Sequence, residues 1–394
     1  MSLTLSTPPP QNHSRSARLW LYLCAMRIGI DARLNYYRPG GSAEYTRHLL
    51  QELAQLDPDS VYYVIHHARD RHTYCPAPNF RRLNTWTPSH HRWERWGLSL
   101  ELWPHHLDIY HATDAIPPQR GARRHILTIH DLHYLHYPQF MTRESLRYYR
   151  DQIRWAVQRA THILVSSQST ARDLMTLLDV PRERVTVHPL GVNTAFRPQP
   201  VEAIRAVRVR WELPQEYLLF VGTFEPRKNI TGLLHAYHRL RSDWTDTPPL
   251  VLVGRRGWLY EEIFATAEQL RLGKALVWVE NAPFEDLPAI YSGARLLALP
   301  SHYEGFGLTA LEAMACGTPP IVSSRGSLPE VVGEAGLLIE PDDVGALAEA
   351  MRRLLQDNAL HAELRQKGLA RAATFTWRRT AEIALRVYRL VGAS

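Results

Sequence analysis

The stretch Ala294-Arg-Leu-Leu-Ala-Leu-Pro300-Ser-His-Tyr-Glu304-Gly-Phe-Gly-Leu308-Thr-Ala-Leu-Glu312-Ala-Met-Ala-Cys316 joins a strand to a helix through a glycine turn. Its start is a short apolar run that ends at a proline, which predicts a buried strand. From Leu308 onward the residues are good helix formers, and Gly317 with the prolines beyond it stops the helix. The stretch is therefore a strand-to-helix turn, and the same alternation elsewhere in the chain sets the fold class.

Two carboxylates mark this turn, because Glu304 precedes it and Glu312 lies about one turn inside the helix. Backbone N–H groups at a helix start are unpaired and carry partial positive charge, so the turn is suited to bind a phosphate or a developing oxyanion. The two glutamates, roughly 12 Å apart at helical rise, could each bind a separate hydroxyl of one long ligand. A nucleotide-sugar has that layout. Glutamate at a helix start also simply complements the dipole, and the stretch alone does not decide between these interpretations.

The composition is that of a globular protein with room for two ordinary domains, at 394 residues, 45% hydrophobic and 22% charged. No apolar run approaches the roughly 18 to 20 residues of a membrane-spanning helix. Three cysteines without paired spacing argue against a disulfide framework or a zinc cluster and indicate a reducing cytoplasm. The net charge of +7 suits nucleotides or an acidic membrane surface, although the arginines are spread along the chain. The sequence contains neither a basic-aromatic sheet signature nor a recognition helix, so it does not indicate nucleic-acid binding.

Residues 1–25 are rich in serine and proline at their start and are expected to be a disordered leader or to follow an upstream start codon. Met26 is then the natural beginning. The apolar run 19–26 is followed at once by Arg27–Asp31, which has the pattern of a core strand. A signal peptide would need its cleavage site where that strand begins.

Strand-like runs alternate with helical ones along the chain, which predicts an α/β fold with parallel sheets. In the first half the predicted strands are Met26–Ile30, Val61–Ile65, Ile109–Tyr110, His125–Ile129, His162–Val165 and Val185–Pro189. In the second half they are Tyr217–Val221, Leu250–Val253, Leu276–Val279, Leu296–Leu299, Pro320–Val322 and Gly336–Ile339. The proline-punctuated run 196–200 resembles a linker, so we expect two Rossmann-like domains, 26–195 and 196–375, facing across a cleft. Ligands bind beyond the carboxyl ends of parallel strands, so both domains would share one site.

The loop Gly222-Thr-Phe-Glu-Pro-Arg-Lys-Asn229 follows the first strand of the second domain and places two adjacent cations at a helix start. Cations there oppose the helix dipole, so an anion is expected to hold Arg227 and Lys228. Lys228 is one of only three lysines in the chain, which argues against surface filler. A diphosphate is the natural counter-ion.

In the first domain, Gly40-Gly41 lies between the first strand and its helix and forms another loop of backbone donors. The loop lacks the G-x-G-x-x-G pattern, and no acidic residue clearly ends the second strand, so redox chemistry with a nicotinamide is disfavoured. His130 and Asp131 follow a buried strand and are expected to face the cleft. His133 and His136 lie nearby, but we expect the His130 imidazole to bind a sugar hydroxyl rather than a metal.

In this order the segments resemble the retaining glycosyltransferases of family 4, which have the two-domain GT-B fold, over roughly residues 26–390. The resemblance is carried by Gly40-Gly41, Ile129-His130-Asp131, Gly191-Val192-Asn193, Gly222–Asn229, Val253-Gly254-Arg255 and the Glu-x7-Glu pattern of Glu304 and Glu312. It implies that residues 376–394 form a closing helix that crosses back to the first domain.

The resemblance also implies roles for single residues. In similar enzymes the residue matching Glu304 contacts the donor sugar, and the one matching Glu312 binds the ribose hydroxyls. The other matches are the amides of Gly305, Phe306, Gly307 and Leu308 on sugar and phosphate, Lys228 on the diphosphate leaving group, Gly41 across the cleft, and His130 near the anomeric carbon.

One position departs from the family pattern. Many relatives carry an arginine close after the glycine matching Gly222, whereas this chain has Thr223, and Arg227 is expected to supply that charge. The Pro-Arg-Lys-Asn form resembles a subgroup that often uses GDP-mannose, so GDP-mannose is the expected donor. The alternatives are a UDP-sugar donor, or a nucleotide-binding protein without turnover.

Transfer from a glycosyl diphosphate requires neutralisation of the leaving phosphate and exclusion of water. Lys228, Arg227 and the loop amides would supply the first, so we expect no metal and no other cofactor. The only Asp-x-Asp match, Asp57-Pro-Asp59, precedes a strand and lies at the end of the sheet away from the cleft. Retention of configuration is implied by the resemblance alone.

The acceptor is expected to be a glycan or a lipid-linked sugar in cell-envelope polysaccharide synthesis, and a small metabolite stays open. The segment from Trp86 to Trp103 is rich in tryptophan, histidine and arginine. It could stack on sugars or lie on lipid headgroups. The expected location is the cytoplasm, with peripheral contact at the inner face of the membrane.

Overall fold

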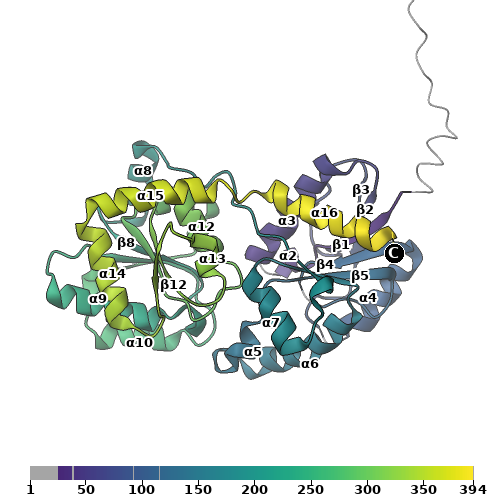
Figure 1. The fold of residues 1–394 in the computed structure, drawn as a ribbon, viewed down its shortest axis with the longest axis horizontal. Coiled ribbons are helices and arrows are strands. Elements are labelled where there is room, and N and C mark those ends of the chain that lie inside the picture. Colours follow the sequence, from purple (N-terminus) through teal and green to yellow (C-terminus); the bar gives the residue numbers. More distant parts are fainter. Residues whose placement is uncertain (1–24, 38–39, 92, 115, 394) are drawn as a thin grey trace, which may run out of the picture.

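The computed structural model describes residues 25–37, 40–91, 93–114 and 116–393, and it contains two parallel sheets (Figure 1). The predicted leader, apart from Ala25, lies outside the described residues. The first sheet has the order β3-β2-β1-β4-β5-β6-β7 and the second the order β10-β9-β8-β11-β12-β13. Every pair of neighbouring strands is parallel. The predicted fold of two Rossmann-like domains is therefore confirmed.

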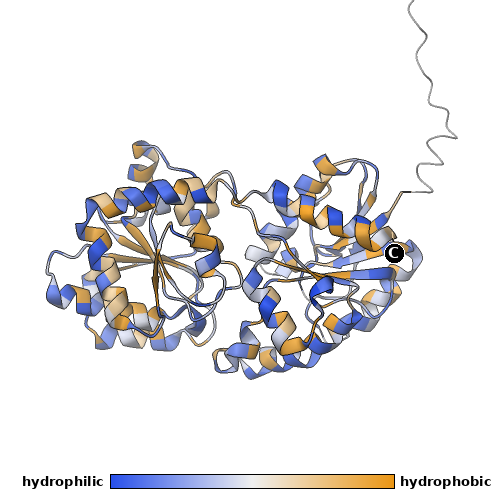
Figure 2. Cartoon of the chain, in the orientation of Figure 1, coloured by the Kyte–Doolittle hydropathy of each residue, from blue (hydrophilic) through white to orange (hydrophobic). Residues whose placement is uncertain are grey.

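All strands except β3 correspond to apolar runs of the sequence, and β3 was not predicted. The first sheet contains β1 (Arg27–Asp31), β2 (Val61–His67), β3 (Phe80–Thr85), β4 (Leu107–Ala112), β5 (Ala122–Ile129), β6 (His162–Val165) and β7 (Val185–Val187). The second contains β8 (Leu218–Val221), β9 (Leu250–Gly254), β10 (Leu276–Glu280), β11 (Leu296–Leu299), β12 (Pro320–Ser323) and β13 (Leu337–Ile339). Strands covered by helices on both faces are apolar throughout, and β8 and β11 are buried at every residue. In Figure 2 the strands of this second sheet are mostly orange.

The helices cover the faces of the two sheets. Around the first sheet lie α2 (Leu34–Tyr37), α3 (Gly41–Leu56), α4 (Glu94–Leu102), α5 (His133–His136), α6 (Arg143–Arg159), α7 (Gln168–Leu178) and the 3-10 turns η1 (Trp103–His105), η2 (Pro138–Phe140) and η3 (Arg182–Arg184). The second half of the chain adds α8 (Val201–Trp211), α9 (Ile230–Asp243), α10 (Glu261–Gln269), α11 (Leu287–Gly293), α12 (Leu308–Ala315), α13 (Leu328–Val332), α14 (Val344–Gln356), α15 (Asn358–Ala372) and α16 (Trp377–Ala393), with η4 (Pro226–Lys228), η5 (Gly273–Ala275) and η6 (Phe284–Asp286).

The last helix, α16, belongs spatially to the first domain. It follows α15 of the second domain and crosses back to lie beside α3 (Figure 1). The hydroxyl of Tyr388 lies 2.7 Å from Nδ1 of His111 in β4, and the ring of Trp377 stacks on that of His48 at 4.7 Å. Both Tyr388 and His111 are fully buried. The first domain therefore includes the end of the chain in its core.

The two domains touch each other directly. The carboxylate of Glu330 in α13 accepts hydrogen bonds from the backbone amides of Gln168 and Ser169, at 2.9 and 3.0 Å. These are the first two residues of α7, so a side chain of one domain caps a helix of the other. The hydroxyl of Tyr303 also donates to the carboxylate of Asp173. These contacts hold the two domains together, with the carboxyl ends of their strands facing each other.

Candidate active site

A cleft of about 770 Å³ lies between the domains, at the carboxyl ends of both sheets. In each sheet the strand order reverses beside the first strand, between β1 and β4 and between β8 and β11, and ligands bind outside parallel sheets at such a point. The lining from the first domain includes Gly41, Asp114, His130, Asp131, Tyr134 and Tyr149. The lining from the second includes Gly222, Thr223, Glu225, Arg227, Lys228, Arg255, Trp258 and Thr309. Five predicted residues, Gly41, His130, Thr223, Arg227 and Lys228, therefore face one cavity.

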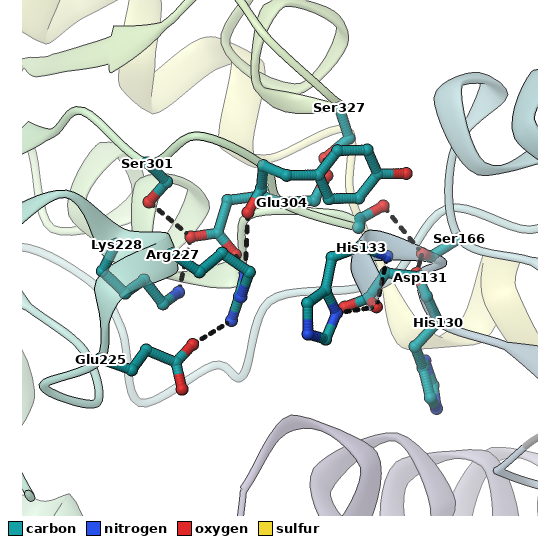
Figure 3. A network of polar contacts seen from close by, with 12 residues as sticks. His130, Asp131, His133, Ser166, Glu225, Arg227, Lys228, Ser301, Glu304 and Ser327 are labelled. Carbon is teal, nitrogen blue, oxygen red and sulfur yellow. Dashed lines mark hydrogen bonds and ion pairs between the residues drawn. The ribbon is translucent and has the colours of Figure 1, made fainter. Parts of the chain in front are cut away.

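The predicted residues Glu304, Arg227 and Lys228 form one buried ionic cluster (Figure 3). Nζ of Lys228 lies 2.5 Å from Oε1 of Glu304, and Nη1 of Arg227 lies 3.0 Å from Oε2. The hydroxyl of Ser301 donates to Oε1 at 2.7 Å. Burial alone would raise the pKa of Glu304, but Lys228 and Arg227 lower it to about 2. Glu304 is therefore a fully ionised carboxylate at neutral pH.

Arg227 also pairs with a second carboxylate, Glu225, at 2.6 Å from its Nη2. With Glu304, the cluster thus contains two cations and two carboxylates, so its formal charge is zero. The Nε atom of Arg227 is buried and meets no hydrogen-bond acceptor among the described residues. Arg255 lines the same cleft and is exposed, and the structure shows no ion pair for it within the described part of the chain. Positive charge that no described carboxylate pairs is therefore available to an incoming anion at Arg255, whereas the cluster itself is formally neutral.

The turn after Glu304 lies against the first domain. A Cβ on Gly305 would lie 2.2 Å from the backbone oxygen of His130, so only glycine permits this approach. The carbonyl of Gly305 accepts a hydrogen bond from the hydroxyl of Ser166 at 3.2 Å. Gly307, which caps α12, has a φ of +97°, a conformation that favours glycine. Gly305 is thus required by the contact with the first domain, and Gly307 by the backbone conformation of the turn.

The amino end of α12 has backbone amides that are unpaired in the described part of the chain. Within the residues that the structure describes, the amides of Gly307 and Leu308 meet no acceptor. The side chain of Leu308 faces Gly41, because a Cβ on Gly41 would lie 3.6 Å from its Cδ1. The ring of Phe306 packs instead on Phe375, with ring centroids 5.9 Å apart. The role predicted for residue 306 therefore concerns its backbone and not its ring.

Glu312 lies one turn into α12 and is half-buried. Its Oε2 accepts a hydrogen bond from the hydroxyl of Tyr291 at 2.8 Å. Burial raises its pKa to about 7, and the negative charge of Glu44 in the first domain adds to this effect. The two glutamates of the motif thus differ in protonation at neutral pH. Their predicted contacts with sugar and ribose stay predictions.

In the first domain, the orientation of the His130 ring is set by a hydrogen bond and an aromatic contact. Its Nε2 lies 3.0 Å from the carbonyl oxygen of Thr113, which can only accept, so Nε2 carries a hydrogen. The ring meets Tyr45 edge to face at 5.2 Å. The neighbouring Asp131 pairs with Nδ1 of His133 at 2.5 Å. Burial would raise the pKa of Asp131, but His133 and then Arg227, from the opposite domain, hold it below its ordinary value.

Sequence reasoning missed a second ionic cluster below the first-domain wall of the cleft. Arg33 is fully buried, and its Nη2 lies 2.6 Å from Oδ2 of Asp31 and 2.5 Å from Oε1 of Glu94. Tyr110 donates to Asp31 at 2.5 Å. The available signal was the position of Asp31 at the carboxyl end of the first strand and of Arg33 two residues beyond it. Glu225, inside the loop already singled out for its cations, was missed in the same way.

Two further findings concern groups that could bind a metal ion and helices that could span a membrane. Among the described residues, no group of three or more His, Cys, Asp or Glu side chains is arranged to hold a metal ion. Asp57 of the Asp-x-Asp match accepts a hydrogen bond from Tyr62 at 2.7 Å. In the described ranges, none of the helices combines the length and apolar character needed to cross a membrane.

Comparisons with known proteins agree with this geometry. The model of the family "Glycosyltransferase Family 4" matches residues 39–196, and that of "Glycosyl transferases group 1" matches residues 205–371. The O-antigen chain mannosyltransferase B of Escherichia coli is 34% identical over 284 residues, which cover 72% of this chain and 74% of the relative.

Two solved structures share the fold. Sucrose-phosphate synthase from Thermosynechococcus elongatus superposes with a TM-score of 0.76 at 24% identity, over 94% of this chain and 100% of the other. An Anabaena protein in complex with UDP-glucose superposes with a TM-score of 0.73 at 17% identity, over 92% and 100%. With two matching family models and a relative aligned over most of both chains, this chain belongs to the family 4 glycosyltransferases of the GT-B fold.

Proposed function

We propose that the enzyme transfers mannose from GDP-mannose, with retention of configuration, to a hydroxyl group of a glycan or a lipid-linked saccharide during polysaccharide synthesis. The O-antigen mannosyltransferase relative supports the sugar and the type of product. The Pro226-Arg-Lys-Asn229 sequence supports the donor. The observation that carries the proposal is the buried cluster of Lys228, Arg227 and Glu304, whose two cations line the cleft between the domains.

The cluster suits a diphosphate leaving group. In the proposed complex, the diphosphate lies between Lys228, Arg255 and the amides at the starts of α12 and α3. The bond between C1 of mannose and the diphosphate oxygen breaks, and its electron pair stays on that oxygen. The acceptor oxygen forms the new bond to C1 on the same face, and its proton goes to the departing diphosphate. Fixed positive groups stabilise the charge that develops on the leaving oxygen.

The ion pair between Lys228 and Glu304 couples recognition of the two halves of the donor. A diphosphate attracts the ammonium group of Lys228, which lies 2.5 Å from Oε1 of Glu304. Oε1 of Glu304 is then available to accept a hydrogen bond from a mannose hydroxyl, while Arg227 continues to hold Oε2. In this scheme Glu304 orients the sugar and the protein supplies the cations, so we propose that turnover needs no metal ion.

The test is a transfer assay with purified protein, an oligomannose acceptor, and GDP-mannose or UDP-glucose as donor, with and without EDTA. NMR of the product gives the anomeric configuration. We expect transfer from GDP-mannose with retention, unaffected by EDTA. Transfer from UDP-glucose alone would overturn the donor assignment. Loss of transfer in EDTA would overturn the metal-independent scheme. Nucleotide binding without any transfer would overturn the proposal that the protein catalyses this reaction.

Lys228→Ala tests the role of the cluster, and the exposed Lys274 provides a matched control. Removal of one charge-stabilising donor from an active site costs on the order of 10² to 10³ in turnover. We expect a loss of that order for Lys228→Ala and wild-type rates for Lys274→Ala. Near-normal transfer by the Lys228 variant would exclude the lysine as the neutralising group.

A further inference from the structure

Helix α4 and its flanks carry a stripe of large apolar side chains on the surface. Trp93, Trp96, Leu100 and Trp103 follow one another at steps of three and four, so they share one helix face. Their exposed fractions lie between 59% and 78%. Trp86 is 69% exposed and lies beside them, because its backbone amide donates to Oε1 of Glu101 in α4 at 3.0 Å.

No other part of the described surface has such a concentration. Every tryptophan among the large, exposed hydrophobic side chains of the described residues belongs to this stripe or, in the case of Trp86, lies beside it. The opposite face of α4 is ordinary core, since Leu98 and Leu102 are buried. Figure 1 places α4 on the side of the first domain that is remote from the second domain. The stripe is therefore accessible and does not serve the contact between the domains.

Arginines surround a hollow at the end of this stripe. The hollow has a volume of about 310 Å³, and its lining includes Trp103, His106, Arg120, Arg123 and Arg159. Arg120 and Arg123 are exposed, and Nε of Arg159 is buried and meets no hydrogen-bond acceptor among the described residues. Among the described residues, one carboxylate forms an ion pair with an arginine of this hollow. It is Asp108, whose Oδ1 lies 3.5 Å from Nη1 of Arg123.

The neighbouring helix α6 is also basic. Its guanidinium-bearing residues are Arg143, Arg147, Arg150, Arg154 and Arg159, against the two carboxylates Glu144 and Asp151. Arg95 of α4 joins the two helices, because its Nε donates to Gln152 at 3.0 Å and its guanidinium lies 3.8 Å above the ring of Trp155. Arg95 thus joins the helix that carries the tryptophan stripe to a strongly basic neighbour.

We infer that this side of the first domain docks on an anionic lipid bilayer, with the tryptophans of α4 in the headgroup layer and the arginine hollow on a lipid phosphate. Tryptophan rings favour the boundary between headgroups and acyl chains, where one end is apolar and the other wet. An amphipathic helix with basic neighbours binds there through both buried apolar area and attraction to anionic headgroups.

The orientation fits delivery of a lipid-linked acceptor. Glu94, the first residue of α4, accepts from the hydroxyl of Tyr148 at 3.2 Å and from the amide of His90 at 2.9 Å. His90 in turn lies 2.8 Å from Asp114, which lines the cleft. The docking helix therefore begins beside the first-domain wall of the cleft. Docking itself does not depend on which sugar the site transfers.

The test is flotation of the full-length protein with vesicles of phosphatidylcholine alone, or of equal parts of phosphatidylcholine and phosphatidylglycerol. We expect the wild-type protein to float only with the anionic vesicles and to be released by salt. The double variants Trp96→Ser/Leu100→Ser and Arg120→Glu/Arg123→Glu should each reduce the bound fraction at least about tenfold, since one basic residue near such a surface contributes roughly fivefold in affinity.

Matched controls come from the second domain. Val209 is 76% exposed on α8, and Arg205 is exposed on the same helix, so Val209→Ser and Arg205→Glu make similar changes elsewhere. They should float like the wild type. Equal flotation of the α4 variants and the wild type, or no flotation at all, would overturn the inference. So would sedimentation that shows the same variants dissociating a dimer, because the stripe would then bind a second copy.

Discussion

Glu304→Gln isolates the charge of the residue at the centre of the ionic cluster while it keeps the size of the side chain. Folding moves the pKa of Glu304 from its ordinary 4.5 to about 2, so the charged form contributes about 3 kcal/mol to the free energy of unfolding at pH 7. The variant also leaves Lys228 buried without its carboxylate partner, because Glu225 pairs with Arg227. Removal of one partner of a buried ion pair is strongly destabilising for this reason.

The pH dependence has a definite sign. A carboxyl group whose pKa is lowered by folding stabilises the protein above its unfolded pKa and loses this effect as the pH falls through its folded pKa. The difference between the wild type and Glu304→Gln should fall from about 3 kcal/mol at pH 7 to about 1 kcal/mol at pH 3. For a domain of this size, the larger value corresponds to a decrease in Tm of about 6 to 12 °C.

Differential scanning calorimetry is the appropriate assay, because it can resolve the unfolding of the two domains. Glu334→Gln is the control, since Glu334 is exposed and its nearest cation, Lys367, lies 3.9 Å away. The control should melt like the wild type. An equal Tm for Glu304→Gln and the wild type at pH 7, or a difference that is the same at pH 7 and pH 3, would refute the view that the cluster is a buried, strongly coupled ion pair.

Three further outcomes follow from single contacts. Glu312→Gln should raise Tm at pH 8 but not at pH 4. Burial raises the pKa of Glu312 from 4.5 to about 7, so ionisation of this carboxyl favours the unfolded state as the pH rises above the lower value, and the cost is fully present above the higher one. Thermal melts at both pH values check this. Gly305→Ala would place a Cβ 2.2 Å from the carbonyl of His130, so the domains should separate; small-angle X-ray scattering should show a larger radius of gyration, and an unchanged radius would contradict the contact. Glu330→Ala removes the acceptor for the first two amides of α7; hydrogen exchange at these amides should accelerate by about tenfold or more, with little change at the far end of that helix.

The strands buried on both faces were predictable, because burial requires apolar side chains on both faces and so leaves a continuous apolar run. The edge strand β3 (Phe80–Thr85) is not among the predicted strands. Its exposed residues include Arg81 and Asn84, so the apolar run is absent. Its pairing with β2 depends on a partner that lies elsewhere in the chain. Ends of other strands differ from the prediction by one to three residues, as for β5, which begins at Ala122 and not at His125.

The site was predictable as a set of strand ends. Thr223, Lys228 and His130 follow buried strands, and the carboxyl ends of parallel strands meet at one edge, so their convergence on one cleft follows from the fold class. The pairing of Lys228 with Glu304 was not predictable. These residues are 76 positions apart, and they meet because β8 and β11 are neighbours although two strands separate them in sequence. Strand order is a property of the whole sheet and leaves no local pattern.

The return of α16 to the first domain has a consequence for how the chain folds during synthesis. The first domain is translated first, yet part of its core, around Tyr388 and Trp377, emerges from the ribosome only after the whole second domain. The second domain can fold as an inserted unit. Until α16 is synthesised, the face of α3 that packs against it stays exposed to solvent. A truncation before Trp377 should therefore damage the domain that carries the amino-terminal sequence, although the deletion is made at the opposite end of the chain.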